Sequence, residues 1–274
     1  MGSKIFFKYR PANEYAIALL EKQEMKFSYA EEYNDPFDSQ LIFNVDSSVE
    51  NILLHLEGTP IDESIKQLLR RRIRNGEITK DVYAGVASEV GERTIMSSCF
   101  SGISPDSSKS LLLWSHYADS HKGVCIGLRD CSSTAIAALK FNVEDSCVDP
   151  SSVLADGLFL VHKVIYSEAG IVEWKPFDQD IGIFIDAHRN KAKCWEYEDE
   201  YRLIVPRGEF SSQILHFDPR FLAEVYLGCL IDGAYRNRIR RVLKVYLDKG
   251  INVRLFQMTR SQKRFALEKE ELDI

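Results

Sequence analysis

The chain has 274 residues, of which 45% are hydrophobic and 11% aromatic, and its formal net charge at pH 7 is −6. This length and apolar content can bury a full core, in one large domain or two small ones. The acidic balance argues against a broad nucleic-acid footprint, because affinity for phosphate backbones depends on a basic surface. We therefore expect a folded, soluble protein.

No stretch approaches the ~20 consecutive apolar residues of a membrane-spanning helix, and the apolar part of the N-terminal segment is too short for a secretory signal. We therefore predict a cytoplasmic protein with no membrane partner. The cysteines lack a C-x-x-C pair and lie mostly in apolar contexts, which indicates reduced thiols and no structural metal. They are Cys99, Cys125, Cys131, Cys147, Cys194 and Cys229.

The N-terminal segment predicts a strand, a helix and a second strand. Residues 4–10 are apolar and aromatic, and residues 12–23 have apolar side chains near helical spacing, with Asn13 as the cap. Residues 25–30 follow as a strand. The motif YNDPFD, at 33–38, predicts a rigid turn that packs its aromatic ring inward.

Residues 49–92 are predicted to be mainly helical. The basic run at 70–74 closes one helix before Gly76, and we interpret it as a solvated face that complements the helix dipole. Residues 93–101 read as a strand. A Ser/Gly/Pro-rich loop and a helix over 110–121 follow.

The second half begins with a short apolar strand at 123–128. The Ser/Asp-rich, poorly periodic region at about 130–157 predicts a variable excursion. Beyond it we predict strands at 159–167, 200–206, 223–228 and 251–258, and helices at 178–193 and 234–250. No linker divides the chain, so the pattern favours a single α+β domain over residues 1–274, with mixed, mainly antiparallel sheets and flanking helices.

A cluster of acids precedes the strand at 200–206. Glu198 and Glu200 are two residues apart and can point the same way, and strand alternation places Glu200 and Arg202 on one face. Two carboxylates in a partly desolvated cleft repel each other, which raises the pKa of one and suits acid/base work. The alternative is a solvated strand edge with cross-strand ion pairs.

Two other segments offer polar groups at strand ends. Arg10 closes the first predicted strand, where a guanidinium can clamp a phosphate or carboxylate. Alternatively, Lys8 and Arg10 are outward charges on an edge strand. Ser98 and Ser101, in the motif SSCFS, have small side chains with hydroxyl groups, which let a ligand approach the backbone closely.

The helix at 110–121 carries further candidates. His116 and Asp119 share a face, as would suit an imidazole oriented by a carboxylate, and Tyr117 or His116 can line a ligand cleft. His116 and His121 are five residues apart and do not form the i, i+4 pair of a zinc helix. A core-and-cap role for this helix stays open.

Several blocks, in order, resemble a mainly bacterial family known as domain of unknown function 2971. They are KYR at 8–10, YNDPFD, the CFS strand, LLLWSHYADSHKGVCIGL and WEYEDEYRLIVP, and they extend over most of the chain. This resemblance brings no established activity with it.

A more distant resemblance is to ADP-ribosyltransferases of the Arg, Ser, Glu type, and it implies their split-sandwich fold. It rests on a strand-end Arg, a strand with Ser-x-Ser character and a Glu-x-Glu ahead of an aliphatic strand. It implies that Arg10, beside Tyr9, contacts the phosphates of NAD. Ser98 or Ser101 would support the nicotinamide ribose, Glu200 would be the catalytic carboxylate, and Glu198 would orient or deprotonate the acceptor.

The leading prediction is thus an NAD-dependent ADP-ribosyltransferase or NAD glycohydrolase, of a kind used in toxins and phage defence. NAD is its substrate, and its acceptor can be protein, nucleic acid, small molecule or water. One alternative is a noncatalytic nucleotide-sensing or partner-binding module. Another is a metal-dependent nuclease-like hydrolase using Asp35, Asp38, Glu198 and Glu200. The basic helix face over 236–241 is a candidate site for a polyanionic partner.

Overall fold

The computed structural model describes residues 4–39, 41–43, 49–58, 62–78, 95–143, 154–168, 172–174 and 182–274. Its contacts divide the chain into two compact units. The first comprises Met1–Ser28, Met96–Val164 and Lys193–Ile274, and the second comprises Tyr29–Ile95 and Ile165–Ala192. The sequence-based expectation of one domain over residues 1–274 stays a prediction.

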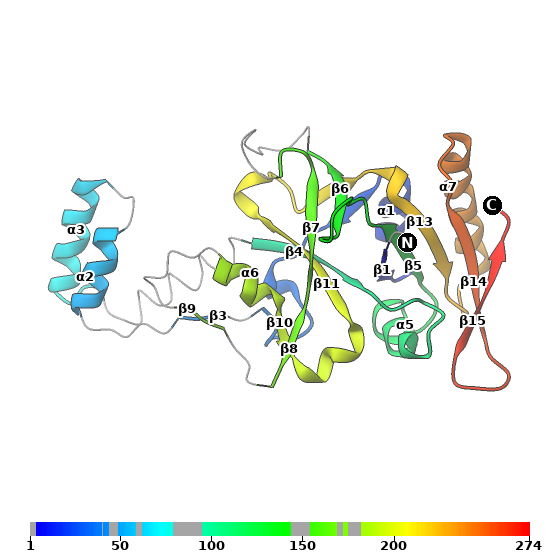
Figure 1. Cartoon of the computed structure of the whole chain (residues 1–274), viewed down its shortest axis with the longest axis horizontal. Coiled ribbons are helices and arrows are strands. Elements are labelled where there is room, and N and C mark those ends of the chain that lie inside the picture. Colours follow the sequence, from blue (N-terminus) through cyan, green and yellow to red (C-terminus); the bar gives the residue numbers. More distant parts are fainter. Residues whose placement is uncertain are drawn as a thin grey trace. The chain divides into compact units, whose positions relative to one another are not determined.

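The first unit is built on an 11-stranded sheet with the order β15-β14-β13-β5-β1-β4-β11-β7-β6-β12-β2 (Figure 1). Its strands are β1 (Ile5–Arg10), β2 (Glu24–Lys26), β4 (Ile95–Ser101), β5 (Val124–Arg129), β6 (Ala138–Asn142), β7 (Leu158–Lys163), β11 (Glu200–Pro206), β12 (Ile214–Phe217), β13 (Leu222–Leu227), β14 (Arg254–Arg260) and β15 (Leu267–Leu272).

The sheet is mainly antiparallel, and its strands and helices confirm the α+β prediction. The pair β13 and β14 is parallel. Helix α7 (Gly233–Asp248) supplies the crossover that a parallel pair requires. The finer expectation, a split sandwich of the ADP-ribosyltransferase type, stays a prediction.

Strand β1 lies inside the sheet, between β5 and β4. Its side chains alternate between two buried faces, because a strand has a period of two. Phe7 and Tyr9 pack against Leu113 and Trp114 of helix α5 (Leu111–Tyr117). Lys8 faces the other way and is also buried. The interpretation of β1 as an edge strand with outward charges is therefore wrong.

Helices α1 (Glu14–Glu21) and α7 pack against each other in the first unit. The predicted cap is confirmed, since the side chain of Asn13 accepts hydrogen bonds from the backbone N–H groups of Tyr15 and Ala16. The Tyr246 hydroxyl of α7 donates to the carbonyl oxygen of Leu20 at 2.5 Å. This bond holds the end of α1 against the last turns of α7.

Helix α5 ends earlier than the sequence pattern predicts. Asp119, Ser120 and His121 have φ angles of 45°, 52° and 70°, and three left-handed residues in succession cannot continue a right-handed helix. The helix predicted over 178–193 is shorter as well. It forms α6 (Gly182–Arg189) and then β10 (Asn190–Ala192).

Some strands do not follow the prediction. Strand β6 lies inside the region predicted as an excursion, of which residues 144–153 are outside the described part. The strand predicted at 159–167 divides at Val164 into β7 and β8 (Ile165–Ser167). Strands β12 and β15 were not predicted.

The second unit contains helices α2 (Val49–Gly58) and α3 (Glu63–Arg74), which share a small core of Ile52, Leu56 and Ile73. Two parallel two-stranded sheets accompany them, β3 (Leu41–Phe43) with β9 (Val172–Trp174) and β10 with β8. The end of the helical region predicted at 49–92 lies outside the described residues. A short 3-10 helix spans Ala30–Glu32.

The turn predicted at 33–38 is confirmed, because Asp35 Oδ1 accepts from the N–H of Phe37 at 2.9 Å. The expected inward packing of Phe37 is wrong, since its side chain is 69% exposed. No described helix combines the length and hydrophobicity needed to cross a bilayer.

Candidate functional site

The three segments singled out for the Arg, Ser, Glu signature lie on three neighbouring strands. Arg10 is the last residue of β1, Ser98 and Ser101 belong to β4, and Glu200 is the first residue of β11. The sheet order places β4 between β1 and β11. Segments far apart in the sequence are thus brought to one part of the sheet.

Lys8 occupies the middle of this region. Its Nζ donates to Ser98 Oγ at 2.8 Å and to the carbonyl oxygen of Cys99 at 2.9 Å. It also lies 4.8 Å from the centre of the Phe100 ring. Burial lowers the pKa of Lys8 well below its ordinary value, and the nearby Arg10 charge adds to this effect. Ser98 is buried and accepts from Lys8, so its hydroxyl has a structural contact.

Glu200 and Arg202 form a buried ion pair on β11. Arg202 Nε donates to Glu200 Oε1 at 2.7 Å. Arg202 is 0% exposed and Glu200 is 4% exposed. The alternative of a solvated strand edge is therefore wrong for these two side chains. Burial, together with the neighbouring Glu200 carboxylate, raises the pKa of the Cys99 thiol to about 12.

Glu198 is held by two other elements. The Tyr117 hydroxyl, from α5, donates to Glu198 Oε1 at 2.6 Å. The Ser101 hydroxyl donates to the carbonyl oxygen of Glu198 at 2.6 Å. Glu198 itself is only 4% exposed. Its carboxylate is therefore fixed in a desolvated position before β11 begins.

Asp199 separates the two glutamates with a left-handed backbone, at φ 42°. Its carbonyl oxygen accepts from the N–H of Gly102 at 2.9 Å. A Cβ at Gly102 would lie 2.4 Å from Asp199 Oδ2 and 2.8 Å from Tyr201 Cε2, so only glycine fits there without displacement. Lys163 Nζ pairs with Asp199 Oδ1 at 3.0 Å.

The aromatic candidates have different surroundings. His116 is exposed, and its ring centre lies 6.2 Å from that of Tyr117 and 6.5 Å from that of Tyr197. Tyr9 is buried, with its ring centre 5.2 Å from Trp114, and burial raises its pKa. Tyr9 therefore packs in the core, whereas His116 and Tyr117 lie next to the acid cluster.

Arg10 is partly buried, and burial lowers the pKa of its guanidinium. The contacts of the described residues include no hydrogen bond between Arg10 and Glu200. Of the predicted site residues, the structure links Glu198 with Ser101 and Tyr117, and it links Ser98 with Lys8. Sequence reasoning placed Arg202 on one face with Glu200, but it treated Lys8 only as an outward charge and it missed Gly102.

In the described part of the chain, no group of three His, Cys, Asp or Glu side chains is placed to bind a metal ion. In the second unit, the buried Asp38 carboxylate pairs with the Nζ of buried Lys191 at 3.5 Å. That carboxylate already has a cationic partner within its own unit.

Comparison with known proteins gives one match. Residues 113–203 fit the model of a family described as protein of unknown function DUF2971, and this range is less than half of the chain. It includes Tyr117, Glu198, Glu200 and Arg202. No curated protein and no solved structure matches the chain. The comparisons support the resemblance to this family and do not support the one to ADP-ribosyltransferases.

Proposed function

We propose that the protein cleaves the bond between nicotinamide and ribose in NAD and transfers the ADP-ribose to an acceptor or to water. One observation supports this proposal most strongly. Arg10, Ser101 and Glu200 lie on β1, β4 and β11, which are neighbours in one sheet. These adjacent strands carry a cation, a hydroxyl and a fixed carboxylate, with Ser101 paired opposite Phe7 and Arg10 three residues further along β1.

The chemistry requires a carboxylate that does not move. When the C–N bond breaks, its electron pair leaves with nicotinamide, and the ribose becomes an oxocarbenium-like cation. A fixed negative charge beside that cation stabilises the transition state electrostatically. Glu200 suits this role, because Arg202 holds one of its oxygens at 2.7 Å and both side chains are buried.

Glu198 takes the second role. The acceptor's nucleophile attacks C1′ of the ribose and gives up a proton, which a nearby carboxylate can accept. Tyr117 orients the Glu198 side chain and Ser101 fixes its backbone. Ser101 is therefore the serine of this proposal. Ser98, which accepts from Lys8, has a structural role.

The experiment uses NAD labelled on its adenylate portion, a cell lysate as the source of acceptors, and three forms of the purified chain. These are the wild type, Glu200→Gln and the matched control Glu196→Gln. Glu196 belongs to the same acid cluster but is exposed and pairs with Lys193 at 3.0 Å. Gln has the shape of Glu without its charge, so the two variants isolate the charge at each position.

We expect label transfer by the wild type and by Glu196→Gln, and none by Glu200→Gln. The labelled molecule then identifies the acceptor. Equal transfer by all three forms would contradict the role of Glu200. If no form turns NAD over but calorimetry shows that NAD binds, the noncatalytic sensor replaces the enzyme as the better explanation.

A further inference from the structure

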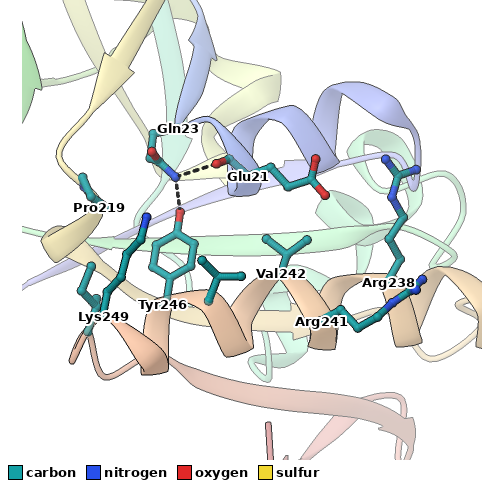
Figure 2. Close-up of a pocket in the computed structure, with 10 residues that line it drawn as sticks. Glu21, Gln23, Pro219, Arg238, Arg241, Val242, Tyr246 and Lys249 are labelled. Atoms are coloured by element: carbon teal, nitrogen blue, oxygen red, sulfur yellow. Dashed lines mark hydrogen bonds between the residues drawn. The ribbon is translucent and has the colours of Figure 1, made fainter.

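A pocket of about 520 Å³ lies between α7, the end of α1 and the turn at Pro219 (Figure 2). This volume is within the range of small-molecule sites. Val242, Val245 and Tyr246 form its floor along α7, at the i, i+3 and i+4 spacing that places side chains on one helix face. The residues of the candidate site do not line it.

The floor of the pocket is fixed by a polar network. Gln23 Nε2 donates to the Tyr246 hydroxyl at 2.8 Å and to the carbonyl oxygen of Leu20 at 3.0 Å. Tyr246 in turn donates to the same carbonyl oxygen. Gln23 has a left-handed backbone, at φ 60°, which turns the chain sharply after α1. The pocket is therefore preformed by rigid contacts.

Positively charged side chains lie at both ends of this apolar floor. Figure 2 shows Lys249 at one end and Arg241, next to Arg238, at the other. Arg241 and Lys249 are eight residues apart, which corresponds to about 12 Å along a helix. Neither forms an ion pair with any other described residue.

Two other arginines on α7 have partners within the protein. Arg238 donates to Glu14 through two nitrogens, and Glu21 adds a second negative charge close to it. Arg240, on the same helix, donates to the carbonyl oxygen of Asp273 at 2.6 Å. Two of the four arginines over 236–241 thus have partners within the protein. This argues against a long polyanion and for a compact ligand.

We propose that this pocket binds a small organic anion with a flat apolar body and one phosphate or carboxylate group. The apolar body would lie on Val242, Val245 and Tyr246, where it replaces water. The anionic group would pair with Arg241 or Lys249, whose positive charges exceed the negative charge that Glu21 supplies. This inference is independent of the proposed action on NAD.

The test measures binding of 1-naphthyl phosphate to the full chain by isothermal titration calorimetry. Two partial ligands test each half of this molecule separately. 1-Naphthol has only the apolar body, and inorganic phosphate has only the anionic group. The variants are Arg241→Gln and Lys249→Gln, with Arg236→Gln as the matched control. Arg236 is exposed on the same helix and does not line the pocket.

We expect saturable binding of 1-naphthyl phosphate, weakened about tenfold in at least one of the two pocket variants, because a charge-assisted contact is lost. Arg236→Gln should bind like the wild type, and each partial ligand should bind at least about tenfold more weakly. Val245→Glu should abolish binding with an unchanged Tm, since Val245 is 49% exposed.

Three results would overturn the proposal. The first is the absence of saturable binding of 1-naphthyl phosphate. The second is an affinity unchanged in both Arg241→Gln and Lys249→Gln, or an affinity unchanged in Val245→Glu. The third is equal affinity for 1-naphthol or for inorganic phosphate, which would show that the body and the anionic group are not recognised together.

Discussion

The Tyr117 hydroxyl donates to Glu198 Oε1 at 2.6 Å, and this bond joins helix α5 to the segment that leads into β11. The two residues are 81 positions apart in the sequence. Both lie in the range matched by the DUF2971 family model. The bond orients a buried carboxylate whose backbone carbonyl oxygen accepts from the Ser101 hydroxyl.

We expect Tyr117→Phe to lower the free energy of unfolding by about 1–3 kcal/mol, because a buried carboxylate loses a donor. Urea unfolding followed by circular dichroism measures this change. The matched control is Tyr15→Phe, since Tyr15 is 82% exposed and should tolerate the loss of its hydroxyl. Equal stability of the two variants would show that the bond to Glu198 has no energetic role.

The buried pair of Glu200 and Arg202 leads to a second prediction. Arg202→Met leaves the Glu200 charge without its 2.7 Å partner and should cost about 3–5 kcal/mol of unfolding free energy. Adding Glu200→Gln removes that charge, so the double variant should regain a large part of the loss. A double-mutant cycle by denaturant titration measures the coupling, and purely additive effects would argue against a direct interaction.

Thiol reactivity tests the environment of Cys99. Its pKa of about 12 means that the thiol stays protonated in the folded protein near pH 8, and only the thiolate reacts quickly. Cys194 is exposed. Iodoacetamide followed by peptide mass mapping should therefore label Cys194 in the native protein and Cys99 only in denaturant. Rapid labelling of Cys99 in the native state would contradict its raised pKa.

The same pKa predicts a dependence of stability on pH. Because the folded-state pKa of Cys99 is raised, the unfolded chain loses this proton first, and the contribution to stability falls as pH rises from about 9 towards about 12. Other groups titrate in this range, so the comparison is with Cys99→Ala. The stability difference between the two proteins should shrink with rising pH, and a constant difference would contradict the prediction.

The left-handed segment after α5 gives a prediction about the backbone. Ser120 is exposed at φ 52°, a conformation that costs a residue with a Cβ about 1–2 kcal/mol and glycine very little. Part of this gain is offset by the greater freedom of glycine in the unfolded chain. Ser120→Gly should therefore raise Tm, whereas Lys244→Gly, on the exposed face of α7, should lower it. Thermal unfolding measures the Tm of both variants, and a lower Tm for Ser120→Gly than for the wild type would contradict this prediction.

The sequence allowed prediction of the elements with strong local signals. Strands β1 and β11 and helix α1 with its Asn13 cap were found from alternation, aliphatic runs and capping chemistry. Strand β15 was missed because it reads LEKEEL and its side chains are mostly exposed, so its strand character comes from pairing with β14. Strand β6 was missed for a different reason, because it lies in a Ser/Asp-rich, poorly periodic stretch although most of its side chains are buried.

The candidate site was predicted in part. Alternation indicated that Glu200 and Arg202 share a face, and they form an ion pair. The burial of Lys8 could not be predicted, because it depends on β4 and β5, which cover both sides of β1. The contact between Tyr117 and Glu198 depends on where α5 packs. Tertiary packing of this kind leaves no local pattern in the sequence.

The decisive measurement is the rate of nicotinamide release from NAD by the purified chain, with Glu200→Gln and Glu198→Gln compared with the wild type. We expect Glu200→Gln to slow release by about 10²–10³, the effect of losing one fixed electrostatic group. Glu198→Gln should keep release but lose transfer to the acceptor. Undiminished release by a folded Glu200→Gln variant would show that Glu200 has no part in breaking the bond.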